Sequence, residues 1–300
     1  MDMEGKTVLV LGGAGLVGSA VCRQLLAAHP AQVTIAARRR SRAEQAVQCL
    51  QADLRTVPIA LAPAWGDVFL RADWQLEESV SKQSILANPE RRRRFVADIL
   101  DPLNRDIVEA SLLSHVIEGR LPGLEDRPAQ VVIDCMNTAS ALSYQNIYAL
   151  AEQLAEHAAG GKSGASITDE IETLLASLYV PQLVRHIQLL HETMRRAGTL
   201  AYIKVGTSGT GGMGLNIPYT HGEEKPSRLL LSKAALAGAQ SLLTFLMART
   251  PGGPNIVKEI KPAAVIGWRE IGYGPICSHG RGIPLYDCPP DQAVPCLLYT

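Results

Sequence analysis

Apolar residues recur along the chain in two alternating patterns. Short runs of strand length are rich in Val, Ile and Leu, and the longer segments between them carry apolar residues three and four positions apart. The first pattern predicts buried strands and the second predicts amphipathic helices. The predicted strands cover residues 6–11, 32–37, 94–101, 130–136, 199–205 and 255–266.

The predicted helices fill the intervals between these strands. They cover residues 19–26, 41–50, 103–112 and 140–157, then a long segment with a break at Pro181 and an end near Gly198, and finally 226–248. Because strands alternate with helices, we predict an α/β fold with a doubly wound, mostly parallel sheet and helices on both faces.

Residues 55–90 interrupt the alternation of predicted strands and helices, and we interpret them as an insertion. The segment holds Pro58, Pro63 and a turn at Trp65-Gly66-Asp67, followed by a polar stretch. An insertion here could serve as a substrate lid or as a partner surface. A surface excursion without a function is an equal alternative, since long insertions are thermodynamically tolerated.

The first predicted strand leads into a glycine-rich turn and then into a helix. Gly12 allows a sharp turn, Gly15 leaves room for a pyrophosphate beside the backbone, and Gly18 lets the helix pack close to the strand. Free N–H groups and a partial positive charge at the helix N-terminus favour phosphate. The candidate phosphate-binding residues are Gly12, Gly13, Ala14, Gly15, Leu16, Val17 and Gly18.

The second predicted strand ends in a basic run, Arg38-Arg39-Arg40, which Ser41 follows. NAD-preferring sites place an acidic residue there to hold the ribose 2′-hydroxyl, and this sequence has none. Guanidinium groups suit the 2′-phosphate of NADP, so Arg38, Arg39 and Ser41 are candidate NADP(H) ligands. The alternative is a solvated charge run at a strand end. Ser41 is also the predicted N-cap of the next helix, with Glu44 completing a capping box.

Composition narrows the class of protein. The 300 residues are 47% hydrophobic and 19% charged with zero formal net charge, which indicates a globular protein and argues against a nucleic-acid surface. We find no apolar run of membrane-spanning length and no basic region typical of a signal peptide, so we expect no membrane partner and a cytoplasmic location. The six cysteines form no Cys-x-x-Cys pair and match no common zinc spacing, so no metal site is predicted.

With these elements placed, the chain resembles the short-chain dehydrogenase/reductase superfamily, in its extended or atypical branch. The resemblance covers about residues 6–270, and its most specific element is the G-x-x-G-x-x-G spacing of Gly12, Gly15 and Gly18. It implies a Rossmann fold that binds NAD(P). The expected division is a dinucleotide-binding domain over 1–270 and a C-terminal segment over 271–300, which is either a small substrate-binding part or a tail.

The resemblance also assigns cofactor contacts. Residues 96–101 are similar to the family segment that contacts adenine, which gives this role to Asp98 and its neighbour Ile99. Asn137 lies where the family's fourth strand passes the nicotinamide ribose. Lys233 is expected to hold that ribose as well.

Family chemistry rests on a Tyr-x-x-x-Lys motif, in which the Tyr exchanges a proton with the carbonyl oxygen. Lys233 matches the Lys, whereas Leu229 stands at the Tyr position. Ser208, after the fifth predicted strand, matches the family's catalytic Ser or Thr. Tyr219 is the candidate for the missing phenol, beside Lys233 or Lys225. The alternative for Tyr219 is an ordinary loop aromatic.

The resemblance implies an NADP(H)-dependent oxidoreductase that acts on a small-molecule carbonyl or alcohol. It also implies a homodimer formed through the helices near 169–197 and 226–248. The missing Tyr keeps open a dinucleotide-binding regulatory or assembly protein without redox activity. An epimerase or dehydratase with tightly held NAD is a third alternative. Arg38, Arg39 and Arg40 argue against it, because such enzymes usually have an acidic residue at the ribose.

Few residues follow the sixth predicted strand, where extended members build much of the substrate pocket. The insertion at 55–90 could serve instead, or a second subunit could complete the site. The third alternative is that the chain is cut short.

Overall fold

The computed structural model describes residues 2–53, 59–76, 82–143, 145, 147–161, 164–206, 228–260, 277–278 and 281–282. The chain divides into two compact units, Met1–Ala264 and Val265–Thr300. In the second unit the structure describes an antiparallel pair, β7 (Cys277–Ser278) with β8 (Arg281–Gly282). The expected division between residues 270 and 271 falls outside the described residues.

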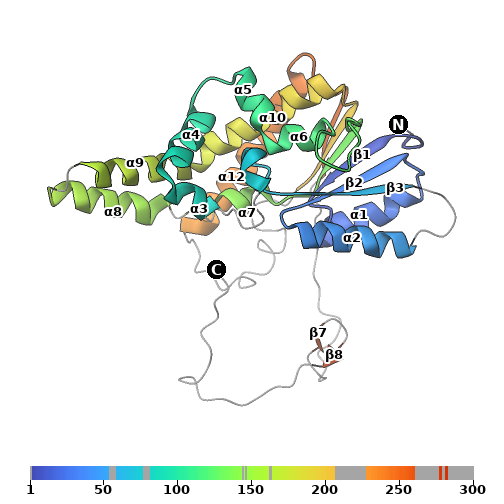
Figure 1. Cartoon of the computed structure of the whole chain (residues 1–300), viewed down its shortest axis with the longest axis horizontal. Helices are drawn as coiled ribbons and strands as arrows, with labels where there is room; N and C mark the ends of the chain where they lie inside the picture. The colour runs from blue at the N-terminus through green and yellow to red at the C-terminus, as the bar shows by residue number, and fades with distance from the viewer. Residues whose placement is uncertain are drawn as a thin grey trace. The chain divides into compact units, whose positions relative to one another are not determined.

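Six parallel strands form the sheet of the first unit, in the order β3-β2-β1-β4-β5-β6 (Figure 1). This order confirms the predicted doubly wound α/β fold. Every strand except β3 lies within a predicted run. The strands are β1 (Thr7–Leu11), β2 (Gln32–Ala37), β3 (Ala60–Trp65), β4 (Val131–Asp134), β5 (Ala201–Val205) and β6 (Ile256–Ile260).

Both faces of the sheet are covered by helices. Helices α1 (Leu16–Leu26) and α2 (Arg40–Asp53) cover one face, and α5 (Arg105–Ala110), α6 (Leu112–Ile117) and α10 (Tyr179–Ala197) cover the other (Figure 1). In β1, Val8 and Val10 pack in the core beneath α1 and α2, whereas Leu9 and Leu11 pack in the core beneath α5, α6 and α10. Successive residues of a strand point to opposite faces, so two-sided burial explains why the strands are continuous apolar runs.

The prediction of the third strand is wrong, and so is the prediction of an insertion. Residues 94–101 fall almost entirely in α4 (Pro89–Leu100), and β3 lies at residues 60–65, within the segment interpreted as an insertion. A capping signal starts α4, because the Asn88 side chain accepts hydrogen bonds from two N–H groups of the first turn and Pro89 follows it. Phe95 and Ile99, the inward residues of α4, are four apart, as in a helix.

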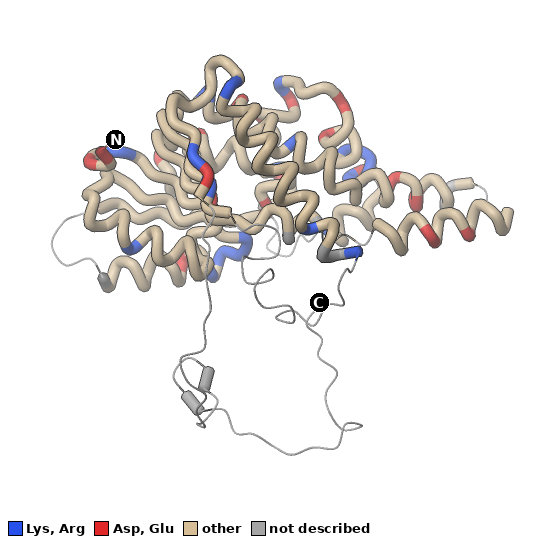
Figure 2. The backbone as a smooth tube through the Cα atoms, turned by 180° about the vertical axis from the view of Figure 1, so that it is seen from behind, with Lys and Arg blue, Asp and Glu red and all other residues tan. Residues whose placement is uncertain are grey.

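Helices α8 (Ile147–Ala159) and α9 (Ala165–Ser177) pack against each other as an arm that projects beyond the sheet (Figures 1 and 2). The buried guanidinium of Arg92 fixes α4 to this arm through ion pairs with Asp169 and Glu172 of α9. The chain breaks between α9 and α10 at Leu178, close to the break predicted at Pro181. The structure also describes α3 (Lys82–Ala87), α7 (Thr138–Ser143), α12 (Arg228–Arg249) and a 3-10 helix (Asp73–Leu76).

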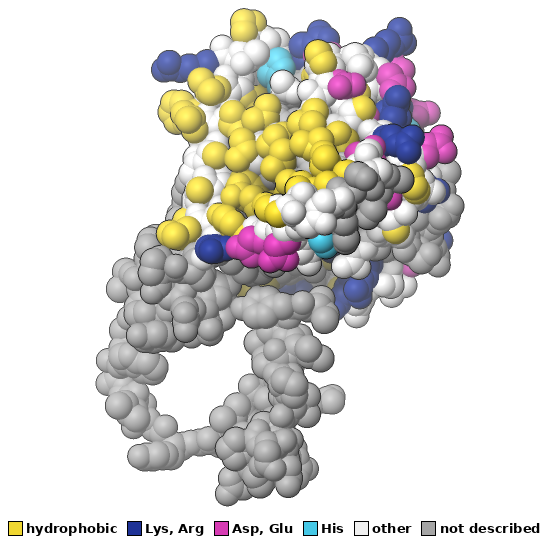
Figure 3. Space-filling model, turned by 90° about the vertical axis from the view of Figure 1, so that its left-hand side faces the viewer, with side chains coloured by type: hydrophobic (Ala, Val, Ile, Leu, Met, Phe, Trp, Pro, Cys, Tyr) yellow, Lys and Arg dark blue, Asp and Glu magenta, His cyan; other side chains and the backbone are white. Residues whose placement is uncertain are grey.

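One helix contains an apolar run of membrane-spanning length, which we did not expect from the sequence. By length and composition alone, Leu231–Arg249 of α12 is long and apolar enough to cross a membrane. A helix in the core of a folded domain meets the same criterion, and the buried residues of α12 include Leu236 and Met247. Its other side exposes Leu242 and Phe245, and Figure 3 shows a face of the molecule on which hydrophobic side chains gather.

A buried ionic network lies in the centre of the sheet, at the ends of β4 and β5. The Lys204 ammonium lies 3.0 Å from Asp134 Oδ1, and both side chains are fully buried. The Tyr202 hydroxyl donates to Asp134 Oδ2 over 2.9 Å, and Lys204 Nζ donates to the carbonyl oxygen of Met136 over 2.7 Å. Burial and the neighbouring Asp134 raise the pKa of Tyr202 well above its usual value.

Removing one partner of this network leaves a buried charge without compensation. We expect Lys204→Met to lower the free energy of unfolding by about 3–5 kcal/mol, because Asp134 stays in the core. Denaturant unfolding followed by circular dichroism measures the change. Lys258→Met, at an exposed position of β6, is the matched control and should stay within about 0.5 kcal/mol of the wild type. A loss of less than about 1 kcal/mol in Lys204→Met contradicts a structural role for the pair.

Candidate functional site

The glycine-rich turn between β1 and α1 has the geometry that the sequence predicts. Gly12 has φ = +73°, a conformation that a side chain disfavours. A methyl group at Gly18 would overlap the carbonyl oxygen of Gly12, so close helix–strand packing requires glycine there. Gly15 is the N-cap of α1, and no side chain caps the helix at that residue. The N–H groups of the first turn are therefore suited to an anion.

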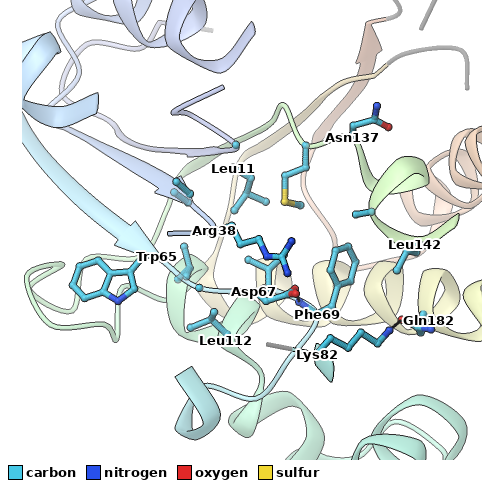
Figure 4. Close-up of a pocket in the computed structure, with 18 of the residues that line it drawn as sticks. Leu11, Arg38, Trp65, Asp67, Phe69, Lys82, Leu112, Asn137, Leu142 and Gln182 are labelled. Carbon is cyan, nitrogen blue, oxygen red and sulfur yellow. Dashed lines mark hydrogen bonds between the residues drawn. The ribbon is translucent and has the colours of Figure 1, made fainter. Parts of the chain in front are cut away.

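A pocket of about 310 Å³ opens at the carboxyl ends of the strands (Figure 4). Such a place, outside the sheet where the strand order reverses, is where open α/β sheets bind ligands. Its wall combines apolar side chains with a few polar ones. The lining residues are Leu11, Gly12, Ala36, Ala37, Arg38, Trp65, Gly66, Asp67, Val68, Phe69, Lys82, Leu112, Val116, Met136, Asn137, Ala141, Leu142, Gln145 and Gln182.

The three arginines after β2 have different surroundings. Arg38 lines the pocket and is drawn within it in Figure 4. Arg39 is exposed. Arg40 makes an ion pair with Glu44 over 2.8 Å and lies 4.9 Å above the ring of Trp65. Only the first of these arginines is therefore among the residues that line the pocket.

Ser41 is not the N-cap that the sequence predicts. Helix α2 already begins at Arg40, so Ser41 lies inside its first turn, and its side chain is exposed. The acidic partner predicted for a capping box, Glu44, instead pairs with Arg40, four residues earlier.

Asp98 and Ile99 do not lie in the pocket, because they belong to α4 rather than to a strand. The Asp98 carboxylate accepts hydrogen bonds from Arg71 at 2.6 and 2.7 Å, and Ile99 is buried in a separate apolar cluster. The position after the third strand, to which the family resemblance gives the adenine contact, is instead held by Asp67. The sequence signal was the Trp65-Gly66-Asp67 turn, which begins at the last residue of β3.

Asn137 lies at the pocket wall, as expected for a residue after the fourth strand. The network beneath it fixes this segment, since Met136 donates its N–H to Asp134 over 2.9 Å and its carbonyl oxygen accepts from Lys204. The carbonyl carbon of Cys135 lies 3.2 Å from where a Cβ on Gly12 would stand. The exit of β4 and the glycine turn therefore form one packed surface.

The predicted catalytic residues are only partly described. Ser208 and Tyr219 lie outside the described residues, as does Lys225. Lys233 lies near the start of α12 and is buried, whereas the side chain of Leu229 is not described. Ser208 and Tyr219 therefore stay predictions.

Two other tyrosines, which the sequence did not single out, approach the start of α12. The hydroxyls of Tyr148 and Tyr179 lie 3.3 and 3.4 Å from Ser232 Oγ, one residue before Lys233. The hydrogen bonds with Ser232 and Tyr179, together with the charge of Arg228, lower the pKa of Tyr148. Two phenols, one on α8 and one on α10, therefore contact α12, the helix that carries Lys233.

A buried histidine adjoins the far side of the site. The ring of His186 on α10 lies 4.9 Å from that of Phe69, which lines the pocket. Burial lowers the pKa of His186 to about 4, so its imidazole is neutral at neutral pH.

The far end of the pocket holds a lysine that sequence reasoning missed. Lys82 Nζ donates to the side-chain oxygens of Gln145, over 2.5 Å, and Gln182, over 2.7 Å. Burial lowers the pKa of Lys82 to about 7, a shift that the charge of Asp67 partly opposes. No local motif marks this group, because its members come from three separate segments.

A family model matches the amino-terminal part of the chain. Residues 8–73 match the NAD dependent epimerase/dehydratase family. This match spans β1 to β3 and includes the glycine turn, Arg38 and Asp67. No curated protein matches the sequence.

Solved structures resemble the chain at low identity. Pen from Bacillus thuringiensis is 12% identical with a TM-score of 0.43, over 87% of this chain and 51% of that chain, so our chain spans about half of its length. A short-chain dehydrogenase/reductase from Serratia marcescens is 15% identical with a TM-score of 0.42, over 87% and 75%. A short-chain dehydrogenase from Sphingobium yanoikuyae in complex with NADPH is 14% identical with a TM-score of 0.36, over 86% and 71%.

The glycine turn, the strand order and the family match agree with one another. The match covers the part of the chain that binds the dinucleotide in such folds. The chain has a Rossmann fold, and its residues 8–73 are similar to the NAD dependent epimerase/dehydratase family.

Proposed function

We propose that the chain is an NADP(H)-dependent oxidoreductase that interconverts a carbonyl and an alcohol on a small-molecule substrate. The observation that carries this proposal is Arg38, which lines the pocket together with Gly12 at a strand end that has no acidic residue. A guanidinium matches a phosphate, whereas an NAD site needs a carboxylate for the ribose hydroxyls. The glycine cradle and the N–H groups of α1 fit the pyrophosphate of either nucleotide.

The reaction assigns a role to each predicted catalytic residue. Bound nicotinamide supplies or accepts the hydride. Ser208, with Thr207 or Thr210 beside it, would donate a hydrogen bond to the reacting oxygen. Tyr219 would exchange the proton with that oxygen, and Lys233 would orient the nicotinamide ribose and favour the proton transfer by its charge.

A second candidate is a dinucleotide-binding regulatory or assembly protein without redox activity. Leu229 at the family's Tyr position favours it. An epimerase or dehydratase is a third candidate, which the family match favours and the arginines after β2 oppose. An assay of NADPH turnover with a panel of aldehydes and ketones, combined with a separate measurement of NADPH binding, distinguishes them. Binding without turnover supports the second or third candidate.

The cofactor assignment predicts a selective loss of affinity. Replacing Arg38 and Arg39 by Ala should weaken NADPH binding about 10- to 100-fold, because charge-assisted hydrogen bonds to the 2′-phosphate are lost, and should leave NADH nearly unchanged. Isothermal titration calorimetry with both nucleotides measures the difference. Arg42→Ala, at an exposed position of α2, is the matched control. An equal loss for NADPH and NADH refutes the assignment to NADP.

The catalytic assignment predicts that Lys233→Ala abolishes turnover while the fold survives. A general acid–base system contributes about 100- to 10,000-fold to a rate, and turnover should fall by a factor in that range. Circular dichroism checks the fold, and Lys258→Ala is the control. Tyr219→Phe and Tyr148→Phe, assayed in parallel, identify the phenol. Undiminished turnover in Lys233→Ala removes this residue from the mechanism.

We also propose that the protein is a homodimer that pairs through α10 and α12. These helices expose Val180, Val184, Leu242 and Phe245, and burying such side chains would stabilise an interface. Phe245→Glu should therefore sediment at half the mass of the wild type in analytical ultracentrifugation. A wild-type protein that sediments as a monomer at micromolar concentration contradicts the proposal.

A further inference from the structure

Lys82 lies at one end of the pocket, beside Gln182 (Figure 4). It begins α3, and its side chain reaches across to the segment between α7 and α8 and to the start of α10. The ammonium also lies 5.0 Å from the centre of the Phe95 ring of α4. Side chains from separate segments thus converge on one nitrogen atom.

The two glutamines are oriented so that both of their oxygens face Lys82. Gln182 Nε2 donates to the carbonyl oxygens of Ala176 and Leu178, at 3.0 and 3.1 Å. Gln145 Nε2 donates to the carbonyl oxygen of Leu142 over 3.1 Å. Because backbone carbonyls anchor the amide nitrogens, the oxygens are left to accept from the lysine. An ammonium has three donors, and within the described part of the chain the glutamines take two of them.

The surroundings of Lys82 are poorly suited to holding a permanent charge. The two acceptors are neutral amides, and Phe69 and Leu142 add apolar surface to the pocket. Asp67, across the pocket, is the charged group whose field acts on Lys82, and it only partly offsets the cost of burial. The other charged side chain that lines this pocket, Arg38, is a cation and cannot compensate Lys82. The side chains that contact the ammonium, Phe95, Gln145 and Gln182, are uncharged. Among the residues that the structure describes, no carboxylate makes an ion pair with Lys82, so this cation lies beside the pocket without a close counter-charge from that part of the chain.

We propose that the Lys82 end of the pocket is a receptor for an anionic oxygen group, a phosphate or a carboxylate, on the molecule that occupies the pocket. An anion there would accept the third hydrogen bond of the ammonium and compensate its charge. This proposal deepens the proposed function, because it rests on that pocket being the place where cofactor and substrate bind. The group has two possible sources, the nucleotide and an acidic substrate.

The proposal couples anion binding to protonation. Near pH 8 the free Lys82 is largely neutral, and an anion stabilises its charged form, so binding takes up a proton from solvent. Near pH 6 the amine already carries its proton, and little uptake is expected. Sulfate can also bind at the α1 N-terminus or at Arg38, but neither site changes protonation in this range. Proton uptake therefore reports on Lys82 itself.

The first measurement uses the wild-type protein and sulfate, which does not titrate near neutral pH. Calorimetry in two buffers with different ionisation enthalpies gives the number of protons taken up. We expect uptake approaching about one proton near pH 8 and close to none near pH 6. The absence of uptake near pH 8 overturns the proposal, and this result is independent of turnover and of nucleotide preference.

The second measurement compares two charge-matched variants, Lys82→Gln in the pocket and Lys258→Gln on the exposed side of β6. Near pH 6, Lys82→Gln should lose about 10- to 100-fold in affinity for sulfate, as for one charged hydrogen bond. Lys258→Gln should match the wild type. If Lys82→Gln fails to fold, Lys82→Arg should bind sulfate without proton uptake. Equal affinities in the Gln variants, or uptake that persists in Lys82→Arg, overturn the proposal.

Two further titrations identify the source of the anion. Weaker NADPH binding in Lys82→Gln, with loss of proton uptake, assigns the group to a phosphate of the nucleotide. Unchanged NADPH binding combined with weaker binding of acetate to the NADPH complex assigns it to the carboxylate of a substrate. If NADPH and acetate both bind Lys82→Gln as they bind Lys258→Gln, the proposal fails, even where the cofactor assignment to Arg38 holds.

Discussion

The buried pair of Asp134 and Lys204 is the constraint on which the centre of this fold depends. Two charges inside a sheet are tolerated only when each is compensated and hydrogen-bonded, and here Tyr202 and the backbone of Met136 complete the set. Because the same atoms hold the exit of β4, the pair also fixes the surface against which Gly12 packs. Stability and ligand geometry therefore share one network.

The pocket therefore has two different sides, one fixed by the buried network and one assembled from separate connecting segments. The rigid side is the sheet end, where the glycine turn, Arg38 and Asn137 follow directly from buried strands. The composite side is built by α3, by the link between α7 and α8, and by α10, which meet at Lys82. Differences between relatives on this fold are carried by such connecting segments rather than by the sheet.

The sequence predicted the rigid side well because its signals are local. Strands β1, β2 and β4 are buried on both faces and so appear as mostly apolar runs, and the glycine spacing marks the turn between β1 and α1. Asp98 was misplaced because the run from 94 to 101 mixes apolar and charged residues in a way that fits both a strand and an amphipathic helix. Lys82, Gln145 and Gln182 carry no shared pattern, since only the tertiary fold brings them together.

Strand β3 lies at one margin of the sheet and contains a proline. Pro63, opposite Ile35 in the parallel register, has no N–H and is tolerated in a strand only where one side is unpaired. Among the described strands, β6 forms the other margin, and it carries the exposed Lys258. Both rims thus resist the addition of a foreign strand, which is how native sheets avoid amyloid-like growth. Self-association of this chain is thereby directed away from sheet extension.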